Sequence, residues 1–151
     1  MLTAMAELHP QLANDCFHIA TLPLSRLLLL NDCRFPWFLL VPDRDNICDI
    51  TQLDDNDQQQ LFRESIVLNR AMQHAFVPDR MNIACIGNMV PQLHVHHIAR
   101  YTHDACWPAP VWGKGSAVHY TDKDRIDKVT RIQHAMAASA EITISWIPET
   151  R

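Results

Sequence analysis

Three short apolar runs follow one another early in the chain, and their spacing limits the folds that are open to it. The runs are "CFHIATL", "RLLLLND" and "PWFLLVP", which occupy residues 16–22, 26–32 and 36–42. Turn residues separate them, and runs this short between such breaks are typical of β-strands. Parallel neighbours need a crossover of about a dozen residues or more. The short gaps therefore predict antiparallel strands.

Two amphipathic segments predict the main helices, over residues 54–76 and 121–139. The first opens with acidic residues and the second with Thr121 and Asp124, which can cap exposed backbone N–H groups. Helical spacing places one set of side chains on a common face in each segment. These sets are Leu61, Ser65, Leu68, Met72 and Ala75, and then Ile126, Val129, Ile132 and Met136.

The remaining segments complete an α+β fold. Residues 80–88 and 92–101 read as two strands joined by the tight "NMVP" turn, and "ITISWIP" near the C-terminus reads as a last strand. The proline-punctuated "CWPAPVWG" at 106–113 reads as an ordered loop. We expect an antiparallel sheet of about five strands with two main helices. A chain of 151 residues suits one domain over 1–151.

Composition excludes several classes of function. The net charge is -4 and no basic run could follow a phosphate backbone, so we expect no nucleic-acid partner. Polar residues interrupt the apolar runs well short of about 18 positions, and the N-terminus lacks the pattern of an export signal, so we expect no membrane association. Five cysteines, an odd number without a C-x-x-C pair, predict a reducing cytoplasmic location.

The stretch "PQLHVHHIAR" at residues 91–100 holds three of the nine histidines of the chain. In a strand, alternate side chains share a face, which groups Gln92, His94 and His96. Leu93, Val95 and His97 then lie on the opposite, core-facing side, with His97 near an exposed end of the strand.

The histidine pattern has three interpretations. It can be the polar side of a half-exposed strand, or two imidazoles that bind zinc or iron with Asp104, His103 or His119 as a third ligand. In the third interpretation one imidazole is a nucleophile or base while its neighbour donates hydrogen bonds to an anion.

The longer stretch "IGNMVPQLHVHHIAR" resembles the signature of the histidine triad family, His-x-His-x-His with apolar residues at x. An earlier strand in that family ends in Val-Pro, as "FLLVPDRD" does here. The resemblance covers about residues 16–105, and residues 106–151 add a loop, a helix and a strand. Two positions depart from the signature: Gln92 replaces the first histidine, and His97 replaces an apolar residue.

The resemblance implies a hydrolase or transferase of nucleoside monophosphate groups that uses no metal or other cofactor. Its substrates would be nucleotide conjugates such as phosphoramidates or dinucleoside polyphosphates. His94 would attack the α-phosphorus to form a covalent nucleotidyl-histidine. The main-chain carbonyl of Gln92 would hold the His94 ring by a hydrogen bond. His96, in its positive form, would contact the phosphoryl oxygens.

Three further residues take roles from the same resemblance. Asn88 would bind phosphate through its amide, and Asn31 and Asp32 would accept hydrogen bonds from the ribose hydroxyls. Each of these residues also suits an ordinary turn. Trp107 and Trp112 would either line the site or anchor the core.

Two alternatives stay open beside the enzyme. One is a nucleotide-binding protein of the same fold that lost its activity with the first histidine. The other is a metal-dependent hydrolase. Release of AMP from an adenosine phosphoramidate separates the enzyme from the binding protein, and sensitivity to chelators identifies the metal enzyme.

We predict a homodimer. The family pairs its sheets, and the short apolar strands of this chain would leave an unfavourable exposed sheet edge unless it is covered. Light scattering at micromolar concentration tests this prediction, and a clean monomer mass would contradict it.

Overall fold

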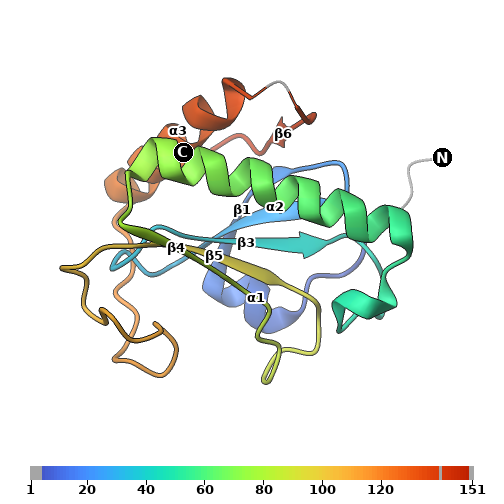
Figure 1. Ribbon diagram of the computed structural model, residues 1–151, viewed down its shortest axis with the longest axis horizontal. Helices are drawn as coiled ribbons and strands as arrows, with labels where there is room; N and C mark the ends of the chain where they lie inside the picture. The colour runs from blue at the N-terminus through green and yellow to red at the C-terminus, as the bar shows by residue number, and fades with distance from the viewer. Residues whose placement is uncertain (1–4, 140, 150–151) are drawn as a thin grey trace.

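The computed structural model describes residues 5–139 and 141–149, which form an α+β fold around one antiparallel sheet (Figure 1). The strand order is β4-β5-β3-β2-β1-β6. Helices α2 and α3 cover one face of the sheet, and the short α1 lies on the other face (Figure 1). In chain order the elements are α1 (Pro10–Asp15), β1 (Cys16–Thr21), β2 (Ser25–Leu30), β3 (Trp37–Pro42), the 3-10 turn η1 (Ile50–Gln52), α2 (Asp55–Phe76), β4 (Arg80–Ala84), β5 (Val95–Arg100), α3 (Asp122–Ala137) and β6 (Ser145–Trp146).

The predicted fold class is confirmed, with six strands where about five were expected. The three early apolar runs form β1, β2 and β3, which pair as antiparallel neighbours. Both main helices form, and their caps are the expected ones. The Asp54 side chain accepts from the Asp57 N–H, and the Thr121 hydroxyl accepts from the Asp124 N–H.

The hairpin around the histidines differs from the prediction. β4 ends at Ala84 and β5 begins only at Val95, so a longer connection replaces the tight turn. The Leu93 N–H donates to the Ile47 carbonyl at 2.8 Å, so a different segment takes the hydrogen bond that a longer strand would have used. His94 therefore precedes β5 instead of lying within it.

Two apolar clusters sandwich the sheet. On the side of α2 and α3, buried side chains of the sheet pack against Leu68 and Ile132. On the opposite side, a second cluster joins Trp37 and Leu39 of β3 to Ile98 of β5. One predicted helix position departs from this arrangement, because Ile126 is 42% exposed on α3.

His97 is fully buried, so the expectation that it lies near an exposed strand end is wrong. It faces α2, where its Nδ1–H donates to the Val95 carbonyl at 3.1 Å and its Nε2 accepts from the Ser65 hydroxyl at 2.7 Å. The strand end is covered because α2 runs across this face of the sheet (Figure 1). Burial lowers the pKa of His97 to about 4, against the smaller opposing effect of the Val95 hydrogen bond.

The surface of the described residues bears on three other expectations. No helix in this part of the chain is long and apolar enough to cross a bilayer. All five cysteines are free thiols, and three of them are exposed. β4 forms one edge of the sheet with Ile83 46% exposed. Pairing of two chains, like the cytoplasmic location, stays a prediction.

Acid should destabilise the fold through His97. Between its ordinary pKa of 6.5 and its folded pKa of about 4, the unfolded chain binds a proton at this position that the folded chain does not. The free energy of unfolding therefore decreases as pH falls through this range, by about 1.4 kcal/mol per pH unit for one such group. Urea unfolding measured between pH 7.5 and 4.5 should show the decline.

The double variant Ser65→Ala, His97→Leu isolates this contribution. It removes the imidazole together with its hydroxyl partner, so neither side chain of that hydrogen bond is left without the other. The decline with pH should become shallower by about 1.4 kcal/mol per pH unit. Replacement of the exposed His103 by Leu is the matched control. An unchanged pH dependence in the double variant would contradict the assignment.

Candidate active site

His94 is held in one orientation by the backbone. Its Nδ1–H donates to the Gln92 carbonyl at 2.7 Å, two residues back along the chain. The imidazole is only 6% exposed, so the surrounding structure fixes the ring as well. A neutral imidazole with its proton on Nδ1 has its lone pair on Nε2. The geometry thus prepares Nε2 of His94 as a nucleophile or base.

His96 is oriented by a side chain from the neighbouring strand. The indole Nε1–H of Trp37 donates to Nδ1 of His96 at 2.9 Å. Burial lowers the pKa of His96 to about 3, assisted by the nearby His94 and His97 and opposed by a hydrogen bond to the Ile86 carbonyl. The ring is therefore neutral at pH 7 in the free protein, and its positive form beside a bound phosphate stays a prediction.

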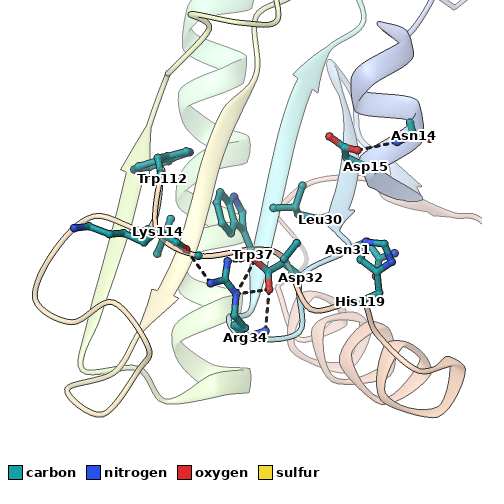
Figure 2. Close-up of a pocket in the computed structure, with 14 residues that line it drawn as sticks. Asn14, Asp15, Leu30, Asn31, Asp32, Arg34, Trp37, Trp112, Lys114 and His119 are labelled. Carbon is teal, nitrogen blue, oxygen red and sulfur yellow. Dashed lines mark hydrogen bonds and ion pairs between the residues drawn. The ribbon is translucent and has the colours of Figure 1, made fainter.

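His94 and His96 line one of two neighbouring cavities that share a wall. One, of about 540 Å³, is lined by His94, His96 and Asn88. The other, of about 420 Å³, is lined by polar and apolar residues together and is drawn in Figure 2. Both have walls formed by Asp15, Leu30, Trp37, Trp112 and Gly113. Together they offer room of the size that small-molecule sites use, about 300–1,000 Å³.

The predicted ribose residues lie in the second cavity, but one of them is engaged. Asp32 is 2% exposed, and its carboxylate accepts from the guanidinium of Arg34 at 2.7 Å (Figure 2). It also accepts from the Val118 N–H. Burial alone would raise the pKa of Asp32, yet these hydrogen bonds hold it below the ordinary value. Asn31 accepts from the Tyr120 N–H at 2.9 Å, a contact that uses the amide oxygen and not the NH₂ group.

Gln92 fastens the N-terminal segment beside the site. Its side-chain oxygen accepts from the His9 N–H at 2.8 Å, and its NH₂ donates to the Glu7 carbonyl at 3.0 Å. The two hydrogen bonds hold residues 7–9, which directly precede α1. Leu12 and Asp15 of α1 line the larger cavity. The side chain at the first motif position thus supports one wall of the site, while its carbonyl holds the His94 ring.

Trp107 and Trp112, the two tryptophans of the loop after β5, lie in different surroundings. Arg100, which is 1% exposed, donates to the Asp104 carboxylate at 2.7 Å and to the Ala109 carbonyl at 2.9 Å. Its guanidinium also lies 5.8 Å from the centre of the Trp107 ring. Trp107 therefore anchors the loop, whereas Trp112 lies in the cavity wall, 5.2 Å from the His96 ring centre.

The candidate third metal ligands are placed elsewhere. Asp104 is bound to Arg100, and hydrogen bonds from that residue lower its pKa to about 2 although burial acts to raise it. The His103 ring lies 5.4 Å from that of Tyr101, and His119 lines the second cavity. Within residues 5–139 and 141–149, no three His, Cys, Asp or Glu side chains gather as a metal site would require.

Sequence reasoning missed two residues of the site, Trp37 and Asp15. Trp37 shares its face of β3 with Leu39, and the pairing of Leu39 with His96 brings the indole within reach of that ring. The alternation of β3 was a usable signal for the face, although not for the partner. Asp15 ends α1, six residues without a helical apolar pattern, so nothing in the sequence indicated its position.

A family model and solved structures both relate this chain to histidine triad proteins. A family model described as "HIT domain" matches residues 11–103. A histidine triad protein from Marinobacter aquaeolei VT8 is 42% identical, with a TM-score of 0.86 over 91% of this chain and 100% of that one. One from Bradyrhizobium japonicum is 39% identical, with a TM-score of 0.86 over 88% and 99%. One from Sinorhizobium meliloti 1021 is 37% identical, with a TM-score of 0.84 over 85% and 96%. None of the curated proteins matches.

Proposed function

The chain belongs to the HIT domain family, which includes nucleotide hydrolases and transferases, and we propose that it cleaves nucleotide conjugates at the α-phosphate. The proposed substrates are nucleoside phosphoramidates or dinucleoside polyphosphates. The proposed intermediate is a nucleoside monophosphate bound covalently to His94. The solved relatives are named only as histidine triad proteins, so the proposal depends on the geometry of this chain.

The observation that carries the proposal is the 2.7 Å hydrogen bond from His94 Nδ1–H to the Gln92 carbonyl. It leaves Nε2 with a lone pair in a ring that lines the larger cavity. In the first step Nε2 forms a bond to phosphorus, and the bond to the leaving group breaks with its electron pair. In the second step water adds to phosphorus and the N–P bond breaks, which returns the imidazole and releases the nucleotide.

His96 and Asn88 are the proposed partners of the phosphoryl oxygens. Both line the same cavity as His94, and the two imidazole rings lie 4.9 Å apart. Because Nδ1 of His96 accepts from Trp37, Nε2 is the nitrogen that carries the proton of the neutral ring, and the nearby Ile86 carbonyl favours this proton. An anionic phosphoryl oxygen is a stronger acceptor than a carbonyl, so we assign this donor to it. Fixed donors at the reacting phosphate stabilise the transition state.

The nucleoside is proposed to extend into the second cavity. Figure 2 shows this cavity between Asp15 of α1 on one side and Trp112 on the other. The Asn31 amide is suited to the ribose hydroxyls, and so is the Asp15 carboxylate, whose hydrogen bonds from Gln11 and Asn14 are exposed, unlike the buried ion pair of Asp32. The two indoles offer apolar faces to a base. Asp32 is assigned a supporting role, because Arg34 and Val118 already occupy its oxygens.

Variants of the motif test the proposal. His94→Ala should abolish release of AMP from an adenosine phosphoramidate, because no other group in the described site has the nucleophilic geometry. His96→Ala should lower the rate by about 10²-fold through the loss of one donor. Gln92→His should change the rate by no more than about tenfold, or roughly 1.4 kcal/mol, because the main-chain carbonyl remains. Steady-state kinetics with thermal melts of each variant measure these effects.

His103→Ala is the control, since His103 is exposed and lies outside both cavities. It should keep the wild-type rate. Wild-type activity in folded His94→Ala would overturn the proposal. Binding of AMP by the wild-type protein without any turnover would favour the non-catalytic alternative. A collapse of the rate in folded Gln92→His would refute the role of the backbone carbonyl.

A further inference from the structure

Trp37 has one polar hydrogen, and it points at His96. An indole N–H is a donor only, so an imidazole nitrogen that receives it must carry a lone pair. The distance from Trp37 Nε1 to His96 Nδ1 is 2.9 Å, within the normal range for such a bond. Both side chains are buried, at 6% and 7% exposure, so water competes little for either group.

We propose that Trp37 is a positioning residue that holds His96 in its neutral, Nε2-protonated form and so directs a single N–H donor into the site. The contribution of this contact to turnover rests on the proposed function. The tautomer itself does not, because it follows from the hydrogen-bond chemistry of two side chains.

The other side of the ring is consistent with this assignment. The Ile86 carbonyl opposes the larger effect of burial on the pKa of His96. A carbonyl can only accept, so it favours a ring that carries an N–H, and with Nδ1 occupied by the indole this N–H is on Nε2.

The surroundings of His96 favour the neutral ring. His94 and His97 lie on the same segment, and protonation of either one would repel a positive His96. Asp15 of α1 is the acidic group in the shared cavity wall, while β3 and the loop near Gly113 present the two indoles. Protonation of Nδ1 would also oppose two N–H groups at 2.9 Å.

A neutral His96 suits the chemistry proposed for His94. As Nε2 of His94 bonds to phosphorus, its ring acquires positive charge. A second cation with its ring centre only 4.9 Å away would oppose that development. A neutral N–H donor assists the phosphoryl oxygens without this penalty. By holding His96 as a neutral donor, Trp37 gives this histidine a role that differs from that of the nucleophile His94.

Nitrogen-15 NMR of the histidine rings tests the inference in the wild-type protein. Long-range ¹H–¹⁵N correlation should show His96 with a protonated Nε2 and an unprotonated Nδ1, unchanged from pH 8 to pH 5. In Trp37→Phe, the ring should become a mixture of tautomers and begin to titrate within this range. The kcat for AMP release should fall by about tenfold, less than in His96→Ala.

Trp112→Phe is the matched control for the spectrum. It removes the other indole near His96, whose Nε1 has no hydrogen-bond partner among the described residues. The tautomer of His96 should stay as in the wild type. A wild-type His96 that carries its proton on Nδ1 would overturn the inference even if Trp37→Phe does not fold.

Two other outcomes would also contradict the role assigned to Trp37. An unchanged His96 spectrum in Trp37→Phe would show that the indole does not set the tautomer. A changed spectrum with an unchanged kcat would show that the contact plays no part in the reaction. The NMR measurement needs no substrate, so a protein that shows the expected spectrum but no turnover would refute the proposed function alone.

Discussion

Burial of three imidazoles within four residues, 94–97, is the constraint on which the arrangement of this protein depends. His94, His96 and His97 are each less than 10% exposed, and a polar ring that is removed from water needs hydrogen-bond partners within the protein. The fold meets this requirement differently for each ring. A main-chain carbonyl serves His94, an indole and a carbonyl serve His96, and a serine of α2 serves His97.

These partners come from elements that the sheet brings together. β5 lies between β3 and β4, so Trp37 of β3 can reach His96 on one face. On the opposite face, α2 crosses the sheet and brings Ser65 to His97 (Figure 1). β5 therefore directs His96 toward the cavity, where it has a proposed role in the reaction, and His97 toward α2, where it is part of the packing. The alternation of a β-strand is sufficient to separate the two roles.

Much of this architecture could be predicted from the sequence, because it depends on local patterns. Short apolar runs gave β1 to β3, and helical spacing with capping residues gave α2 and α3. The contact between His94 and the Gln92 carbonyl was expected from the resemblance to the histidine triad family, and it joins residues only two positions apart. The grouping of His94 with His96 followed from strand alternation.

The rest depends on contacts between residues far apart in the chain. Trp37 and His96 are 59 residues apart, and their meeting depends on the register of β3 against β5. Gln92 binds the backbone at Glu7, 85 residues away. α1 is too short to form a stable helix alone, so its local signals, Pro10 in the first turn and the His9 cap, are not sufficient to predict it. His97 was misplaced for the same reason, because its burial is decided by α2.

The central claim is that His94 carries the nucleotide during turnover, and isolation of the covalent adduct tests it most directly. Wild-type protein mixed with an adenosine phosphoramidate is quenched within one turnover in alkali, which preserves a phosphorus–imidazole bond. Mass spectrometry of the intact chain and its peptides then locates the modification. The account predicts one adenylyl group on His94, absent from His94→Ala. Turnover without any adduct, or an adduct on His96, would contradict it.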